Sequence, residues 1–151
     1  MLAVTTTLGG FDAVGFAQAS RVDWVSIADV IEAAISWIEA INPTLGGLAY
    51  CRVFTQARPT ALNTVGRFFS GVHTCIKDSI DVTEQRTMWG SDAWVPQNAF
   101  DDCEFTRLYL VTGLVLLGKT QLSEFGFSAS VEHLSLMSCG TPTAPPVPHL
   151  R

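Results

Sequence analysis

Residues 71–127, GVHTCIKDSIDVTEQRTMWGSDAWVPQNAFDDCEFTRLYLVTGLVLLGKTQLSEFGF, determine how this sequence is interpreted. Their first segment, 72–76, is short and apolar and predicts a strand that leads into Lys77 and Asp78. A lysine at a strand end is partly desolvated, so it can act as a neutral base. The alternative is a structural lysine paired with Asp78 or Asp81. From spacing alone this alternative is favoured, because ion pairs are much commoner than catalytic lysines.

The rest of the stretch predicts a loop, a helix and a strand in turn. Residues 83–98 show no period and predict mostly loop. Asp101 and Asp102 place negative charge at the start of a helix that is expected to run to about Val111. Gly113 ends this helix, and the apolar run 114–117 predicts a buried strand. A helix followed by an apolar strand favours an α/β architecture whose strand ends carry the chemistry.

Before this stretch, the sequence predicts one long amphipathic helix. Apolar residues recur with a helical period over 27–41. Ser26 and Asp29 fit a capping box at its start, and Asn42-Pro43 is expected to stop it. The wide apolar face indicates that the helix packs against a larger body.

The remaining upstream segments give weaker signals. Residues 48–54 predict a strand, and 55–65 predict a helix that is weakened by Pro59. Residues 1–20 are rich in Gly, Thr and Ala without a steady period, so this segment is expected to be loose at its start.

Composition limits the classes of protein to which the chain can belong. Its 151 residues fit one domain, and 48% are hydrophobic but only 15% are charged, against about a quarter in an average protein. The most apolar run, 108–117, is too short for a membrane span of about 20 residues, and no basic segment precedes a signal-peptide-like site near Ala17. A cytoplasmic part of a larger fold is therefore the preferred interpretation, with no membrane partner.

Charge and cysteines exclude two further classes of site. The net charge is −5, and the chain has two lysines and no basic run, so no nucleic-acid partner is expected. The four cysteines are scattered and no histidine stands at a ligand spacing, which predicts reduced thiols and no metal site. No cofactor is expected.

Taken in order, the motifs of this stretch resemble the amidase signature family. The matching residues are Gly71-Val72-His73, Ile76-Lys77-Asp78, Asp81-Val82, Thr87, Gly90-Ser91, Asp101, Gly113, Gly118-Lys119-Thr120 and Glu124-Phe125. The resemblance extends over roughly 26–130, and the helix 27–41 resembles the N-terminal helix of the family. The family usually has proline at His73 and asparagine at Gln121.

The resemblance implies both a fold and a mechanism. The fold class is α/β, the N-terminal portion of the amidase signature fold, in which helices flank a mixed sheet, and it is incomplete here. The mechanism is hydrolysis of carboxylic amides by a Ser–cisSer–Lys triad, in which Lys77 accepts a proton through a bridging serine and a second serine attacks the carbonyl carbon. Asp78, Asp81, Gly90 and Ser91 would form the supporting network.

Other residues of the matching motifs are assigned a scaffold role. Lys119 and Thr120 at a strand end, and Glu124 after it, are expected to be structural rather than catalytic. The substrate implied by the resemblance is a small-molecule amide, if the site is completed.

Both serines of the family triad lie downstream in Gly/Ser-rich segments, and nothing after Ser130 matches such a segment. The chain is therefore divided into a loose segment 1–20, a partial amidase signature domain 21–132 and a Pro-rich tail 133–151 that is not family sequence. The tail is interpreted as the product of a shifted reading frame or a truncation and is expected to be disordered. It also fits P-x-x-P spacing, typical of ligands for SH3-type domains, but an unstructured end is preferred.

Three functions are compatible with these observations. The first is an amidase whose sequence is incomplete here, which would be inactive alone. The second is a non-catalytic fragment or interaction module of a split or frameshifted amidase. The third is a small cytosolic binding domain with a related fold. Because a partial core would expose apolar surface, self-association through that face is expected.

Overall fold

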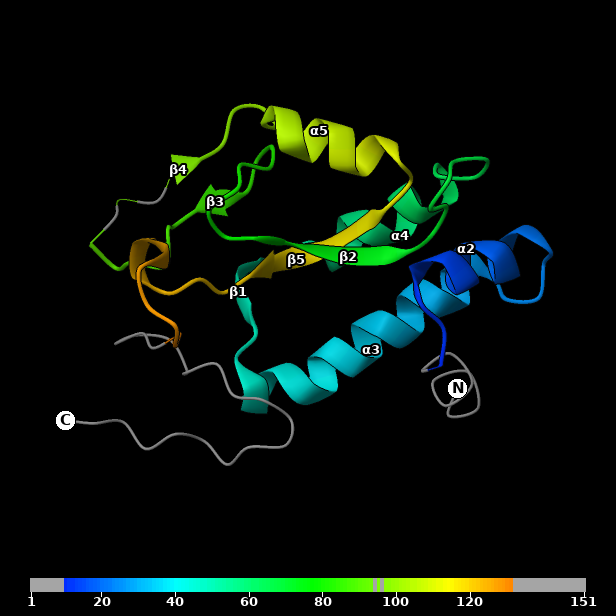
Figure 1. The fold of residues 1–151 in the computed structure, drawn as a ribbon, viewed down its shortest axis with the longest axis horizontal. Helices are drawn as coiled ribbons and strands as arrows, with labels where there is room; N and C mark the ends of the chain where they lie inside the picture. The colour runs from blue at the N-terminus through cyan, green and yellow to red at the C-terminus, as the bar shows by residue number, and fades with distance from the viewer. Residues whose placement is uncertain (1–9, 94, 96, 132–151) are drawn as a thin grey trace.

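The computed structural model describes residues 10–131 except 94 and 96. Figure 1 shows a small central sheet with helices on both of its sides. The elements in chain order are α2 (Ala13–Arg21), α3 (Ile27–Leu45), β1 (Leu48–Arg52), α4 (Phe54–Leu62), β2 (His73–Lys77), β3 (Arg86–Thr87), β4 (Gln97–Asn98), α5 (Glu104–Val111), β5 (Val115–Thr120) and the 3₁₀ helix η1 (Glu124–Gly126).

The central sheet is mixed, as predicted. Its strand order is β1-β5-β2, with β2 parallel to β5 and β1 antiparallel to it. The parallel register pairs Lys77 with Thr120, so the carboxyl ends of β2 and β5 lie side by side. Strands β3 and β4 form a separate two-stranded sheet. A parallel pair needs a crossover connection, and here the chain from β2 to β5 supplies it and includes α5.

The main core lies between this sheet and the pair α3 and α4. Ile31 and Ile35 of α3 pack with Ala57 of α4 and with Val115 and Leu117 of β5, and all five are almost fully buried. Apolar residues at helical spacing on α3 therefore meet alternate residues of a buried strand, as their periods require.

On the other side of the sheet, α5 packs over the first part of β2 and β5. The Tyr109 hydroxyl shares a hydrogen bond of 2.8 Å with the hydroxyl of Thr74. Tyr109 also packs against a smaller apolar cluster that contains Val72, Leu114 and Ala17. Figure 1 shows α5 and α3 on opposite sides of the sheet, so two layers of helix enclose the strands.

A helix that the sequence did not predict precedes α3. Helix α2 has no strong period, but the carboxylate of Asp12 accepts a hydrogen bond of 2.7 Å from the Gly15 amide. This N-cap satisfies one of the amide groups that a helix start leaves without an intrahelical partner. The signal was present in the sequence at Asp12 and was outweighed by the Gly- and Thr-rich composition around it.

The predicted ends of α3 were wrong in two respects. Ser26 occupies the N-cap position, but its side chain makes no capping hydrogen bond. The helix also continues through Pro43 to Leu45 and ends where Gly46 adopts a left-handed φ of 60°, with its amide donating to the Asn42 carbonyl. Gly46, and not the proline, therefore terminates the helix.

The predicted start of α5 was also wrong. The helix begins at Glu104, and Cys103 is its N-cap residue. Asp102 instead accepts hydrogen bonds from the Thr83 amide at 2.6 Å and the Thr83 hydroxyl at 2.8 Å. Asp102 therefore fixes the loop before the helix. The following strand extends to Thr120, beyond the predicted 114–117.

Within the part of the chain that the structure describes, no helix is long and apolar enough to cross a bilayer. The tail assigned to 133–151 lies outside the described residues.

Candidate active site

The candidate site lies where β2 and β5 end. Lys77 is the last residue of β2, and the amide of Asp78 continues the ladder by donating to the Thr120 carbonyl at 3.1 Å. Ligands of α/β proteins commonly bind outside the carboxyl ends of parallel strands. The strand ends therefore place Lys77 where the α/β interpretation expects the chemistry.

The Lys77 side chain is exposed, which corrects the expectation of partial desolvation. It forms no hydrogen bond or ion pair with any residue that the structure describes. The alternative, an ion pair with Asp78 or Asp81, is therefore not formed either. Both carboxylates have other partners, and these leave the Lys77 ammonium group accessible.

Asp78 is the centre of a buried polar cluster. It is 3% exposed, and its carboxylate accepts hydrogen bonds from the amides of Met88, at 3.2–3.3 Å, and Gly90, at 3.3 Å. Lys119 Nζ lies 3.4 Å from Asp78 Oδ1. A buried carboxylate requires this degree of compensation, because the loss of hydration is costly.

Lys119 is fully buried and binds three groups from different parts of the chain. Besides Asp78, its ammonium group donates to the Arg86 carbonyl at 2.6 Å and to the Thr87 hydroxyl at 2.9 Å. It therefore connects β5, the end of β2 and β3. This environment favours the scaffold role that was expected for Lys119.

Asp81 connects the same loop to α5. Its carboxylate accepts a hydrogen bond of 2.7 Å from Thr87, which already binds Lys119. Its backbone carbonyl accepts from the Thr106 hydroxyl at 2.6 Å and from the Cys103 amide at 3.4 Å. The structure therefore brings Asp78 and Asp81 into one network, in which the Asp78 carboxylate binds Lys119 and the Asp81 carboxylate binds the Thr87 hydroxyl.

Gly90 and Ser91 attach this loop to the segment after β5. Gly90 has a φ of 64°, and a Cβ atom at this position would lie 2.2 Å from the Leu122 carbonyl oxygen. Only glycine allows both the conformation and the close approach. Next to it, the buried Ser91 hydroxyl donates to Glu124 Oε1 at 2.6 Å, so Glu124 is a scaffold contact in this structure.

Two bulky residues, one in the loop after β3 and one in the segment after β5, have unusual backbone conformations. Trp89 has a φ of 55° and Phe125 a φ of 48°, both in the left-handed region. The Phe125 amide donates to the Trp89 carbonyl at 2.8 Å, so the two residues are directly linked. The sequence does not predict this pair, because nothing in a sequence reports a strained φ at an aromatic residue.

Two titratable groups of β2 are perturbed by burial. Burial lowers the pKa of His73, and its Nδ1 atom is buried without a hydrogen-bond partner. Burial also raises the pKa of the Cys75 thiol to about 11. At the start of α5, hydrogen bonds from Thr106 lower the pKa of Cys103. Among the described residues, no group of three His, Cys, Asp or Glu side chains could hold a metal ion.

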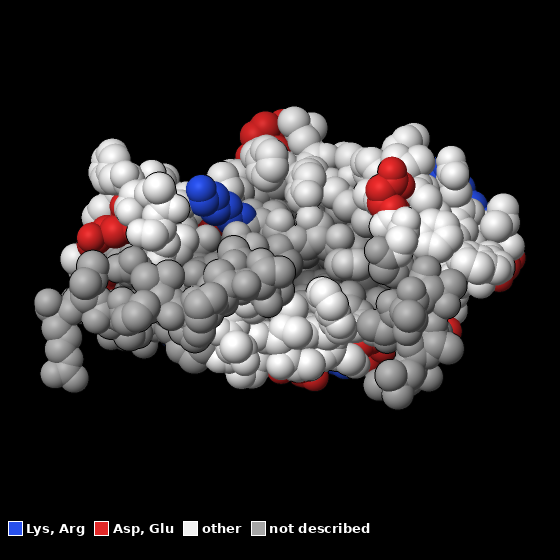
Figure 2. All heavy atoms as spheres, turned by 60° about the horizontal axis from the view of Figure 1, so that its bottom comes forward, with Lys and Arg blue, Asp and Glu red and all other residues white. Residues whose placement is uncertain are grey.

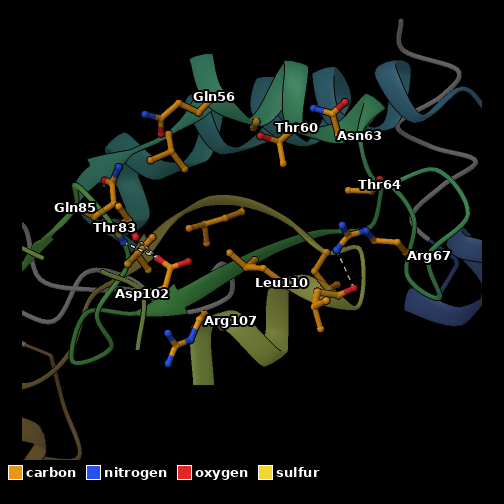
Figure 3. A pocket seen from close by; sticks show the side chains of 16 residues that line it. Gln56, Thr60, Asn63, Thr64, Arg67, Thr83, Gln85, Asp102, Arg107 and Leu110 are labelled. Carbon is orange, nitrogen blue, oxygen red and sulfur yellow. Dashed lines mark hydrogen bonds between the residues drawn. The ribbon is translucent and has the colours of Figure 1, made fainter. Parts of the chain in front are cut away.

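A separate groove of about 450 Å³ lies between α4 and α5. Figure 3 shows Gln56 and Thr60 on its α4 side and Arg107 and Leu110 on its α5 side. None of the predicted site residues lines this groove. This groove and the candidate catalytic lysine are therefore different places on the molecule.

Comparison with known proteins gives a consistent family. The Amidase family model matches residues 29–147, and so extends into the segment 133–151. AmiC of Mycobacterium leprae, which is named as an amidase, is 69% identical over 129 residues, covering 85% of this chain. The 6-aminohexanoate-cyclic-dimer hydrolase of Paenarthrobacter ureafaciens is 27% identical over 124 residues, covering 80% of this chain and 25% of its own length.

Solved structures show the same fold. The structure of a 6-aminohexanoate cyclic dimer hydrolase superposes with a TM-score of 0.72 and 26% identity, covering 81% of this chain and 26% of that one. The peptide amidase of Stenotrophomonas maltophilia gives a TM-score of 0.69 with 22% identity, covering 78% and 26%. This chain spans 27% of the length of the M. leprae relative. The fold, the motifs and these matches lead to one conclusion: the chain belongs to the amidase family.

Proposed function

We propose that this chain supplies the lysine part of an amide-hydrolysing site. Lys77 would accept the proton of a bridging serine held in a cis peptide, and that serine would deprotonate a second, nucleophilic serine. The nucleophile attacks the amide carbonyl and expels ammonia or an amine, and water then hydrolyses the acyl-enzyme. The two serines would come from Gly/Ser-rich segments that the 151-residue sequence does not contain.

The observation that carries this proposal is the contrast between the two lysines. Lys119 is fully buried and fully bound, as a scaffold lysine should be. Lys77 is exposed at the carboxyl end of a parallel strand and has no described partner. A proton acceptor must have its amine free for the group that it deprotonates.

In this proposal the supporting residues hold Lys77 in place and do not react themselves. They are Asp78, Asp81, Gly90 and Ser91. The Asp78 carboxylate and Lys119 fix the loop after Lys77, and Asp81 attaches that loop to α5. Gly90 and Ser91 attach it to the segment that follows β5. The lysine is thus held on a rigid strand end rather than on a free loop.

The proposed substrate is a small-molecule amide, and no cofactor enters the chemistry. Relatives named as a cyclic-dimer hydrolase and an amidase support an amide bond as the shared element. The net charge of −5 argues against a nucleic-acid partner, and we propose a cytoplasmic location.

A second candidate function is a non-catalytic part that associates with a complementary amidase polypeptide. It is supported by α5, on which Phe105, Leu108 and Val111 are 54%, 61% and 59% exposed. Three large apolar side chains on one short helix form a surface that is usually covered. In both candidates the chain alone has no hydrolytic activity.

Ammonia release from a panel of small amides tests the proposal. The 151-residue chain is compared with a chimera in which the 129 matching residues of the M. leprae relative are replaced by those of this chain. We expect release from the chimera, and none from the chain above its Lys77→Ala variant. Release by the chain alone that is lost in Lys77→Ala contradicts the proposed incompleteness. An inactive chimera beside an active unaltered relative contradicts the proposed function.

A further inference from the structure

We propose that Trp89 and Phe125 form an aromatic binding site beside Lys77 that takes the aromatic or apolar substituent of a neutral amide. The inference rests on the proposed function, because it assigns a substrate class to the same site. It concerns binding only and includes no covalent step.

The position of the pair follows from backbone contacts. Trp89 lies between Met88 and Gly90, and the amides of both neighbours donate to Asp78, the residue after Lys77. Phe125 is joined to Trp89 by its own amide. Both aromatic residues therefore belong to loops that meet at the carboxyl end of β2. Figure 1 shows η1, which contains Phe125, at the same end of the molecule as β3, the strand just before Trp89.

The conformation of both residues indicates a role beyond packing. A left-handed φ is a genuine outlier for a bulky side chain and costs free energy. It persists where surrounding contacts determine it, and such residues cluster at binding sites. Here the Ser91–Glu124 hydrogen bond of 2.6 Å and the contact of Gly90 with the Leu122 carbonyl hold the two loops together.

The two rings are not accounted for by the core. Trp89 is 38% exposed and Phe125 is 41% exposed, and neither belongs to the two core clusters of the described residues. Neither ring stacks on another described aromatic ring. Two accessible aromatic residues held in fixed, strained conformations are thus left with a free apolar surface.

The proposed function supplies the amide, and the two exposed rings favour an apolar end to the ligand. The Asp78 carboxylate is buried against Lys119 and is not available to a ligand, and one oxygen of the exposed Glu124 carboxylate accepts from Ser91. Aromatic side chains bind other rings in offset or edge-to-face geometry. An aromatic carboxamide would place its ring on Trp89 and Phe125 and its amide group toward the strand end that carries Lys77.

The test is an NMR titration of the 151-residue chain with benzamide, and with acetamide as the probe that lacks a ring. The indole signal of Trp89 is assigned by its loss in Trp89→Phe. We expect benzamide to shift this signal and to leave those of Trp24 and Trp37 in place, and we expect no shift with acetamide at the same concentrations. Phe125→Ala should weaken benzamide binding about two- to tenfold, whereas Phe127→Ala, at a residue that is 90% exposed, should not.

Each outcome bears on the inference separately from the hydrolytic function. Benzamide binding that persists in Lys77→Ala supports the aromatic site whether or not the lysine accepts a proton. No shift at Trp89, equal shifts at Trp24 and Trp37, or equal responses to acetamide and benzamide overturn the inference. If Phe125→Ala loses its native spectrum, the wild-type titration decides alone, because it compares signals within one folded protein.

Discussion

At the residue scale, Lys77 and Lys119 lie near the carboxyl ends of neighbouring strands in opposite surroundings. Lys77 is exposed with no described partner, whereas Lys119 is fully buried and binds Asp78, Arg86 and Thr87. The sequence shows both lysines after apolar strands, so local pattern alone does not separate them. The sheet register and the loop 86–91 do, because they bring the partners to one lysine only.

This difference predicts unequal reactivity with an amine-specific acetylating reagent. Lys77 should be acetylated in the native chain, because its amine is accessible. Lys119 should be protected until the chain is unfolded in denaturant, because its amine is buried and bound. Peptide mass spectrometry of native and unfolded samples measures both sites in one experiment. Equal modification of the two lysines in the native chain would show that the environments are assigned wrongly.

His73 predicts a pH dependence of stability. Burial lowers its folded-state pKa below the ordinary value of 6.5, so the unfolded chain binds the proton more tightly. Above the pKa of His73 in the unfolded chain, the imidazole is neutral in both states and the folded chain keeps its full stability. As the pH falls below that value toward the pKa of His73 in the folded chain, stability is lost. Replacing His73 by Phe removes the titrating group and keeps a ring against Phe16, with which His73 makes an edge contact.

We therefore expect the free energy of unfolding to fall less in His73→Phe than in the wild type when the pH is lowered from about 7 to about 5. Urea denaturation at each pH provides the measurement. Parallel curves for the two proteins over this range would mean that His73 does not contribute.

At the scale of elements, the sequence predicted the order of helices and strands better than their ends. The α3 helix, the strand before Lys77 and the buried β5 follow from apolar period and from the resemblance. Helix ends depended on contacts made elsewhere: Asp102 binds Thr83 instead of capping α5, and Gly46 ends α3 after Pro43. The Ser91–Glu124 link joins residues far apart in sequence, so no local pattern could predict it.

The buried ion pair between Lys119 and Asp78 connects the ends of β5 and β2 at the site. Lys119→Met should destabilise the chain by about 3–5 kcal/mol, because it leaves the Asp78 charge buried without a cation. Combining it with Asp78→Asn should cost less than the sum of the two single changes, since neither charge is then left alone.

Urea denaturation of the two single variants and the double variant measures this coupling. Arg58→Ala is the matched control, because it breaks the exposed ion pair with Glu32 and should have a much smaller effect. Additive effects of Lys119→Met and Asp78→Asn would contradict a direct interaction between the two groups.

At the scale of the whole molecule, the described residues include many exposed large apolar side chains. On α5, the side chains of Phe105, Leu108 and Val111 are exposed. On the face shown in Figure 2, most of the described residues are uncharged, and few acidic or basic side chains are visible. Such a surface favours association, because little like-charge repulsion opposes contact between apolar patches.

We expect the isolated chain to form dimers or larger species in sedimentation velocity, and Leu108→Lys to shift the distribution toward monomer. Trp37→Lys, at a residue of α3 that is 60% exposed, is the control and should shift it less. A wild-type chain that is a single stable monomer would contradict the predicted association through α5.

The central claim is that Lys77 is the proton acceptor for amide hydrolysis, and the most direct test measures ammonia release by the chimera with the M. leprae relative. Both Lys77→Ala and Lys77→Arg should lose about 10²- to 10⁴-fold in rate, because neither side chain can serve as a neutral base. Arg58→Ala, on the surface of α4, should leave the rate unchanged. A chimera that keeps its full rate without Lys77, or with arginine in its place, would contradict the account.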